Sequence, residues 1–273
     1  MLETLKQTTA YIESKVSVKP EVGIILGTGL GGLAKDIKNP ETIDYADIPN
    51  FPVSTVEGHH GRLIFGDLGG KEVVAMQGRF HFYEGYNMKE VTFPVRVMKY
   101  LGIKQLFVSN ASGGVNPEFE IGDLMIINDH INLLPNPLIG PNNSEFGPRF
   151  PDMSQAYDHS LIALAQEIAA KHSIKTQIGC YVGTTGPTFE TPKEYQYFRI
   201  IGGDTVGMST VPEVIVARQM GIPVFAISII TDLGVPGKIV EVTHEEVQRI
   251  GMQAEKKMTL ITVSYTHLRA HET

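Results

Sequence analysis

Residues 78–85, with the sequence GRFHFYEG, combine side chains whose types and spacing suit the binding of an anion. Arg79 and His81 are two positions apart, so an extended chain points both side chains to one face. The planar guanidinium of Arg79 suits a phosphate, and His81 can donate to the same anion while Glu84 orients its imidazole. The alternative is a solvated strand end with an ordinary Arg–Glu pair, which the density of charged and aromatic residues disfavours.

A second anion-binding signal is the glycine-rich turn at residues 27–32, with the sequence GTGLGG. Gly27, Gly29 and Gly32 match the dinucleotide pattern G-x-G-x-x-G. A dinucleotide site needs a βαβ unit of about 30 residues, and no apolar second strand appears before Leu63. A plain tight turn is another interpretation. We favour a phosphate-binding turn, because glycines expose backbone N–H groups and Thr28 adds a hydroxyl donor.

Two weaker signals concern the same kind of ligand. His59 and His60 lie in a polar loop, and no further Cys or His stands at metal-ligand spacing from them. We interpret His59 as a substrate contact, with an exposed surface histidine as the alternative. Residues 110–114 (NASGG), which include Ala111, follow a strand and suit an anion-binding nest, or else form a simple strand-to-loop turn.

Other residues indicate a planar heterocycle. Phe189 can stack on a ring while Glu190 accepts N–H protons, although a buried Phe beside a helix-capping Glu explains the pair equally well. Ser209 precedes a short helical segment, as a cap or an anion ligand. Asp232 ends an apolar run, where an Asp often only forms a turn. His244 begins the last helical segment, either as a residue of the cap region or as a ligand donor.

The elements that must position these residues alternate along the chain. Helical patterns are found at residues 89–101, 159–172, 194–201, 212–220 and 244–260, the last with Thr243 as its N-cap. Strand-like apolar runs are found at residues 22–26, 63–65, 73–77, 106–109, 124–128, 177–182 and 224–230. This alternation predicts an α/β domain with a twisted, mixed and largely parallel sheet flanked by helices. Ligands of such sheets bind beyond the carboxyl ends of the strands, where the polar segments gather.

Composition limits the classes of protein. The chain has 273 residues, 42% of them hydrophobic, and a formal net charge of −7, which disfavours a nucleic-acid-binding protein. Cys180 is the single cysteine, no apolar run is long enough to span a membrane, and the amphipathic start is not a signal peptide, so we expect a cytoplasmic protein. We expect residues 262–266 to break the last helix. We predict one domain over residues 1–263 and a non-native tail over residues 264–273.

The chain resembles the trimeric class of purine nucleoside phosphorylases over residues 22–260. The resemblance rests on ordered motifs: ILGTGLGGL, STVEGHHGRLIFG, MQGRFHFYEGY, SNASGGVNPEFEIGD, GPNNSEFGPRFPDMS, GPTFETPKE and VGMSTVPEVIVAR. It implies a phosphorylase/hydrolase-like fold and reversible conversion of purine nucleoside and phosphate into purine and ribose 1-phosphate. It also implies that phosphate is a co-substrate and that neither a metal nor an organic cofactor takes part.

The resemblance further implies roles for single residues. Phosphate is expected to contact Thr28, His59, Arg79, His81, Ala111 and Ser209. The nucleoside is expected to contact Tyr83, Phe150, Tyr181, Phe189, Glu190, Val206, Gly207, Met208, Asp232 and His244, although Met208 is by type more often a core residue. The expected catalytic groups are His81, Glu190, Asp232 and His244. Phe150 is expected to reach the ribose pocket of a neighbouring subunit in a homotrimer.

Asp232 departs from the family pattern, in which members selective for 6-oxopurines commonly have Asn. An ionised Asp accepts from a 6-amino group, whereas it donates to O6 only when protonated. Glu190 favours a purine with a proton on N1. We therefore expect inosine and guanosine as the main substrates and adenosine as a further one.

Three other functions fit part of the pattern. A methylthioadenosine phosphorylase has the same fold, but His244 suits a ribose 5′-hydroxyl better than a methylthio group. A nucleoside hydrolase activates water and does not need the anion-binding set. A nucleoside-binding protein would bind inosine without turning it over, and in such a protein replacing Arg79 by alanine would barely change affinity.

Overall fold

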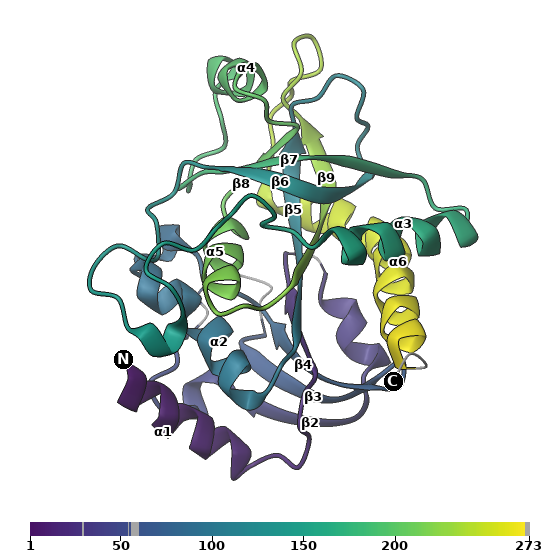
Figure 1. The fold of residues 1–273 in the computed structure, drawn as a ribbon. Coiled ribbons are helices and arrows are strands. Elements are labelled where there is room, and N and C mark those ends of the chain that lie inside the picture. Colours follow the sequence, from purple (N-terminus) through teal and green to yellow (C-terminus); the bar gives the residue numbers. More distant parts are fainter. Residues whose placement is uncertain (29, 54, 56–59, 271–273) are drawn as a thin grey trace.

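The computed structural model describes residues 1–28, 30–53, 55 and 60–270, and within the last of these it leaves out the side chains of residues 265 and 267–270. A single mixed sheet organises this part of the chain (Figure 1). Its strand order is β2-β3-β4-β1-β5-β8-β7-β6-β9, and β5 also pairs with β9. The strands are β1 (Val22–Leu26), β2 (Lys38–Asp44), β3 (Arg62–Leu68), β4 (Lys71–Gln77), β5 (Gln105–Gly114), β6 (Leu124–Asn132), β7 (Thr176–Gly183), β8 (Thr205–Gly207) and β9 (Val224–Leu233).

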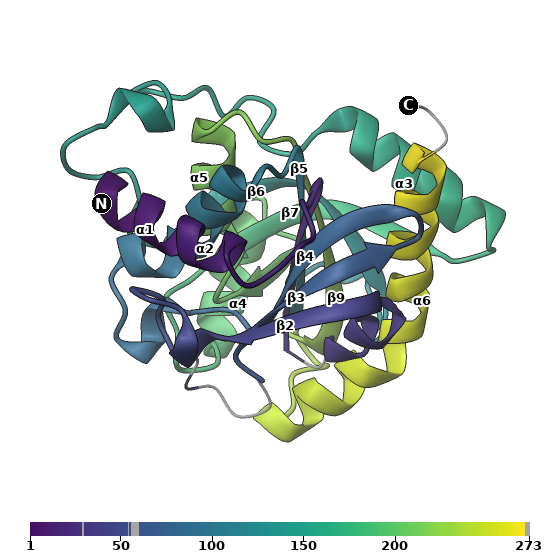
Figure 2. The ribbon, with the colours of Figure 1, turned by 90° about the horizontal axis from the view of Figure 1, so that it is seen from below.

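Helices cover both faces of the sheet, as two perpendicular views agree. α1, α2 and α5 lie on one side, and α3 and α6 lie on the other (Figures 1 and 2). None of the described helices is both long and apolar enough to cross a membrane. The α-helices are α1 (Leu2–Glu13), α2 (Met88–Leu101), α3 (His159–Lys171), α4 (Pro192–Ile200), α5 (Val211–Gln219) and α6 (His244–Ala270).

The predicted α/β fold is confirmed, because each apolar run identified in the sequence lies in a strand. β1 has the predicted bounds, and all five of its residues are buried between parallel neighbours β4 and β5. The expectation that no apolar second strand appears before Leu63 is confirmed, although a polar strand, β2, lies in that interval. β2 occupies the edge of the sheet and pairs antiparallel with β3, and it is mostly exposed and polar, so it carries no apolar signal.

Three parallel neighbours bring the predicted anion-binding segments together. β1 pairs with β4 on one side and with β5 on the other, in the same direction. The turn that follows β1 therefore lies between the segment that follows β4 and the last residues of β5. Thr28, Arg79 and Ala111 are thus brought to one edge of the sheet.

The other half of the sheet closes on itself. β5, β8, β7, β6 and β9 pair in a ring, with β9 returning to β5. The β5–β9 ladder is irregular at its end: Ser112 pairs with Ile230, whereas the next residue, Gly113, pairs with Asp232. Thr231 is therefore the extra residue of a β-bulge, a feature that commonly re-aims side chains beside binding sites. The bulge brings both Thr231 and Asp232 to the same cavity.

The last helix is longer than expected. α6 runs without interruption to Ala270, so the predicted break at residues 262–266 is wrong. Thr262 and Thr266 remain helical with their hydroxyl groups donating to backbone carbonyls one turn earlier, at Met258 (3.1 Å) and Val263 (2.9 Å). The non-native origin of residues 264–273 stays a prediction. At the other end of the helix, Thr243 and Glu246 form the predicted N-terminal cap.

Candidate functional site

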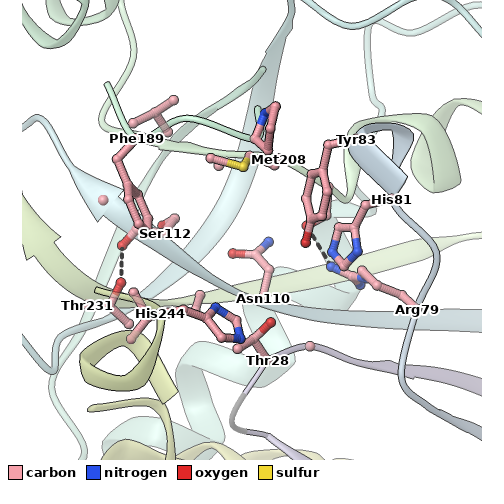
Figure 3. Close-up of a pocket in the computed structure, with 18 of the residues that line it drawn as sticks. Thr28, Arg79, His81, Tyr83, Asn110, Ser112, Phe189, Met208, Thr231 and His244 are labelled. Atoms are coloured by element: carbon pink, nitrogen blue, oxygen red, sulfur yellow. Dashed lines mark hydrogen bonds between the residues drawn. The ribbon is translucent and has the colours of Figure 1, made fainter. Parts of the chain in front are cut away.

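A cavity of about 460 Å³ lies at the carboxyl ends of β1, β4 and β5 (Figure 3). In this view Phe189 and Thr231 lie on one side of the open centre, and Arg79 and His81 lie on the other. The cavity brings together thirteen of the residues expected in the site: Thr28, Arg79, His81, Tyr83, Ala111, Phe189, Glu190, Val206, Gly207, Met208, Ser209, Asp232 and His244.

Three expected site residues are not among those that line the cavity. Tyr181 is buried behind Gly207, where a Cβ would lie 2.3 Å from the tyrosine oxygen, and its hydroxyl accepts a hydrogen bond from the Ser209 backbone N–H. Tyr181 therefore supports Gly207 and Ser209, which line the cavity, from behind. Phe150 is 88% exposed and lines a different pocket. His59 lies outside the described residues.

Arg79 is the centre of the anion-binding end. Its Nη1 donates to Ser209 Oγ at 2.7 Å and to Thr210 Oγ1 at 3.3 Å. Asn110 Nδ2 donates to the same Thr210 hydroxyl at 2.8 Å and thereby connects it to β5. Thr210, at the start of α5, has a left-handed φ of 69°. Such a conformation is costly for a β-branched residue, so the surrounding hydrogen bonds must stabilise it.

Within the described part of the chain, Arg79 retains unused donors. The side chain is 2% exposed, yet its Nε and Nη2 have no hydrogen-bond partner. Glu213 on α5 places one carboxylate oxygen 3.4 Å from Nε, and its other oxygen is also unpartnered. Buried charged groups are rarely left unsatisfied without a ligand. A tetrahedral anion accepts several hydrogen bonds and would satisfy the guanidinium.

His81 is held in place by its neighbours. Glu84 Oε1 accepts from the His81 backbone N–H at 2.8 Å and lies 3.0 Å from Nδ1, as the spacing of the two residues predicts. Tyr83 stacks on the imidazole with ring centroids 4.7 Å apart. Burial lowers the pKa of His81, while the bond to Glu84 opposes this effect. Burial raises the pKa of Glu84, but hydrogen bonds from His81 and Thr55 outweigh burial and lower it to about 2.

These bonds determine the protonation of the pair. Glu84 is ionised at neutral pH, so it accepts a hydrogen bond from Nδ1–H of His81. With Nδ1 donating to Glu84, Nε2 of His81 accepts a hydrogen bond when the imidazole is neutral and donates one when it is protonated. The segment after β4 therefore contributes a fixed cation at Arg79 and an adjustable proton donor at His81.

The turn after β1 approaches β5 very closely. Gly27 N–H donates to Ser109 Oγ at 3.3 Å, and a Cβ on Gly27 would lie 2.7 Å from the Ser109 carbonyl oxygen. Only glycine permits this approach, which explains the first glycine of the GTGLGG segment. The 3₁₀ helix that follows, η1 (Gly31–Asp36), has its first N–H groups capped from α6. Glu255 accepts hydrogen bonds there from the backbone N–H groups of Gly32 and Leu33.

If the Thr28 turn binds phosphate, as the sequence predicts, Glu255 should tune that binding, since it fixes the backbone immediately after the turn. Replacing Glu255 by alanine removes a helix cap, a change that typically costs about 1 kcal/mol. We expect the KM for phosphate to rise about 3- to 10-fold, with little change in the KM for inosine. The control is Glu167→Ala, at an exposed carboxylate on α3. Equal increases in both KM values would contradict this role.

The opposite end of the cavity contains two carboxylates, Glu190 and Asp232. Burial raises the pKa of Glu190 to about 7, and Asp232 adds to this effect. Burial likewise raises the pKa of Asp232, although hydrogen bonds from Thr231 and Tyr195 oppose it. Phe189, partly exposed, provides an aromatic face beside these groups. An aromatic face next to carboxylates of adjustable protonation suits a purine.

Sequence reasoning missed several residues of the site. Glu213 and Tyr195 do not line the cavity but contact Arg79 and Asp232, which do; they are positioned by α5 and α4, and in the sequence they look like ordinary residues of helices. Asn110 lies in the predicted anion-binding segment at residues 110–114, where the resemblance implies a role only for Ala111. Val247 lies one turn after His244, at the spacing that places both on one face of α6, which was a usable signal.

The described residues contain no cluster of three or more His, Cys, Asp or Glu that could hold a metal ion. Of the two adjacent histidines, His60 is among the described residues and His59 is not. The described site offers hydrogen-bond donors and acceptors, a buried arginine and carboxylates of raised pKa.

Comparisons with known proteins agree with this geometry. Residues 21–267 match the family model of the phosphorylase superfamily. Purine nucleoside phosphorylase 1 of Bacillus subtilis is 54% identical over 251 residues, which are 92% of this chain and 93% of that protein. Purine nucleoside phosphorylase of Rattus norvegicus is 48% identical over 94% of this chain and 91% of its own length.

Solved structures show the same similarity in three dimensions. Crystal structures of Schistosoma mansoni purine nucleoside phosphorylase superpose with TM-scores of 0.93 for a complex with adenosine and 0.92 for a complex with inosine. These are 45% and 44% identical, and each comparison covers 97% of this chain and 96% of the other. The chain therefore belongs to the phosphorylase superfamily and, within it, to the group of purine nucleoside phosphorylases.

Proposed function

We propose that the protein catalyses the reversible phosphorolysis of purine nucleosides to free purine and ribose 1-phosphate. The observation that carries the proposal is the buried Arg79 with two unpartnered donors, in the same cavity as the carboxylates Glu190 and Asp232. An anion at the guanidinium and a purine at the carboxylates would place the glycosidic bond between them. The named relatives support the same reaction.

The anion-binding end would supply the nucleophile. Arg79, Ser209 and Thr28 line one part of the cavity, with His81 and the backbone of Ala111 close by. Cleavage of a glycosidic bond passes through an oxocarbenium-like sugar, which a fixed phosphate stabilises and then attacks. Phosphate is thus a co-substrate, and the proposal includes neither a metal nor an organic cofactor.

The base end would assist departure of the purine. Negative charge accumulates on the purine as the bond breaks, and a proton shared at N7 relieves that charge. Asp232 is the side chain placed to share it, while Glu190 accepts from N1–H of a 6-oxopurine. Inosine and guanosine are the proposed main substrates, with their deoxy forms. Adenosine is a further substrate because Asp232 accepts from its 6-amino group.

The ribose would lie between these two ends. Tyr83, Met208 and His244 line the cavity there, and the amide of Gln248 donates to His244 Nε2 over 3.0 Å. A polar group at this position favours a ribose 5′-hydroxyl over the methylthio group of methylthioadenosine. It also makes His244 a candidate for a catalytic role through the orientation of the sugar.

The assembly and location are parts of the same proposal. Phe150 is exposed in the single chain, which supports a homotrimer in which it contacts the ribose bound to a neighbouring subunit. His59, which is outside the described residues, is proposed to help position phosphate. We propose a cytoplasmic enzyme of purine salvage that binds neither nucleic acid nor membranes.

The experiment that tests the proposed function follows free base released from inosine, guanosine and adenosine, in parallel, with and without phosphate. We expect release that depends on phosphate, with inosine and guanosine as the better substrates. Release without phosphate would indicate a hydrolase. Binding without any turnover would indicate a nucleoside-binding protein.

A further inference from the structure

Tyr195 on α4 connects the two carboxylates of the base end. Its hydroxyl lies 3.4 Å from Asp232 Oδ2 and is also hydrogen-bonded to Glu190. The side chain is buried, and its ring packs so closely on Gly234 that a Cβ there would lie 2.3 Å from ring carbons. The hydroxyl is thus held between two carboxylates by a ring that has little freedom to move.

One hydroxyl proton cannot serve two ionised carboxylates. If both Glu190 and Asp232 were charged, Tyr195 would donate to one and turn an oxygen lone pair toward the other. If one carboxylate is protonated, Tyr195 donates to the ionised partner, and the proton of the acid is donated to the tyrosine oxygen in the empty site or to the base when a purine is bound. The arrangement is therefore satisfied when the pair holds a single proton. Burial is the main cause of the raised pKa values of Glu190 and Asp232. These raised values agree with one proton held by the two carboxylates.

The two carboxylates differ in their other donors. Thr231 Oγ1 lies 3.0 Å from Asp232 Oδ1 and 3.3 Å from the Ser112 carbonyl oxygen, so its one hydroxyl proton can turn to an ionised Asp232, which then keeps a side-chain donor without Tyr195. The hydrogen bonds that the described residues provide to Glu190 come from Tyr195 and from its own backbone N–H, and the negative charge of Glu194 is nearby. Glu190 therefore depends more strongly on the Tyr195 hydroxyl for its ionised form.

The two classes of purine require the single proton on different carboxylates. A 6-oxopurine has a donor at N1 and an acceptor at O6, so it fits an ionised Glu190 and a protonated Asp232. A 6-aminopurine has an acceptor at N1 and donors at its amino group, so it fits a protonated Glu190 and an ionised Asp232. The total number of protons is the same in both complexes.

We propose that Tyr195 is a positioning residue for substrate choice: its hydroxyl donates to whichever of Glu190 and Asp232 is ionised, so that one shared proton accommodates both 6-oxo- and 6-aminopurines. This inference rests on the proposed function, in which the two carboxylates contact the base. The proton moves from one carboxyl oxygen to the other, the tyrosine hydroxyl reverses its direction, and no other group gains or loses a proton.

The test compares kcat/KM for inosine and adenosine at saturating phosphate in Tyr195→Phe. Without the hydroxyl, Asp232 retains Thr231 as a donor while Glu190 does not retain a side-chain donor, so the proton moves to Glu190. We expect the inosine-to-adenosine ratio to fall about tenfold, the effect of one hydrogen bond to a charged group. Tyr197→Phe, at a half-exposed tyrosine on the same helix, is the matched control and should leave the ratio unchanged.

A second variant should act in the opposite direction. Thr231→Val removes the donor that remains to Asp232 and leaves the Tyr195–Glu190 bond in place, so the proton moves to Asp232 and the ratio should rise. If the two variants only disturbed packing, kcat/KM would fall for both inosine and adenosine, and the inosine-to-adenosine ratio would not change in opposite directions in Tyr195→Phe and Thr231→Val. If neither ratio moves, or if both move in one direction, the inference is wrong. If the unaltered protein releases base from neither nucleoside in phosphate, the proposed function itself fails.

Discussion

Replacing Arg79 by alanine is expected to lower kcat/KM for phosphate by about 10²- to 10³-fold, the usual effect of removing one preorganised donor from an oxyanion site. Arg79 is buried, is oriented by Ser209 and Thr210, and has two donors without a hydrogen-bond partner, of which Nε faces Glu213 at 3.4 Å. The measurement is initial rate against phosphate concentration at saturating inosine. Arg249→Ala, at an exposed arginine on α6, is the control and should behave like the unaltered protein.

The same substitution should also destabilise the fold, because it leaves Glu213 buried without its cation. Uncompensated buried charges cost about 3–5 kcal/mol, which lowers the thermal midpoint by several degrees. The double variant Arg79→Met, Glu213→Gln should recover much of this stability without recovering activity. Recovery of phosphate turnover in the double variant would contradict the assignment of Arg79 to the anion.

Replacing Asp232 by asparagine is expected to increase the inosine-to-adenosine ratio of kcat/KM by about 10- to 100-fold, since leaving a buried polar group unsatisfied costs about 1–3 kcal/mol. Asn donates to O6 through its amide nitrogen and accepts from a proton on N7 through its oxygen. With adenosine, the base presents two donors, the 6-amino group and the protonated N7, whereas the Asn side chain has only one acceptor, its amide oxygen. The measurement is the pair of kcat/KM values at saturating phosphate.

Two results would contradict this account of Asp232. An unaltered protein that clearly prefers adenosine over inosine would show that Glu190 does not select for a proton on N1. An unchanged ratio in Asp232→Asn would show that Asp232 does not contact the 6-substituent. Asp129→Asn, at an exposed aspartate of β6 away from the cavity lining, is the control for the loss of one carboxylate.

The buried strands were predictable because burial on both faces leaves a direct mark on sequence. β1 consists of five apolar residues, and its predicted bounds are correct. β2 has one buried residue among seven and lies at the edge of the sheet, so packing imposes no pattern on it. β8 is only three residues long and is defined by its partners β5 and β7. The end of α6 was missed because β-branched residues are weak helix formers, whereas packing and local hydrogen bonds keep them helical.

The site was predictable where chemistry is concentrated in one segment. The pairing of His81 with Glu84 follows from a spacing of three residues, and the glycine turn follows from its pattern. The partners that come from distant segments were not predictable, because Glu213 reaches Arg79 and Tyr195 reaches Asp232 only in the folded chain. Charged or aromatic residues in amphipathic helices are usually solvated or packed, so their types alone give no reason to select them.

The central claim is that the cavity holds phosphate as the nucleophile toward a purine nucleoside. Its most direct test measures hypoxanthine and the sugar product together during the conversion of inosine. We expect base to be released only when phosphate is present, with one ribose 1-phosphate formed for each hypoxanthine. Release of hypoxanthine together with free ribose, at a rate that does not depend on phosphate, would contradict it.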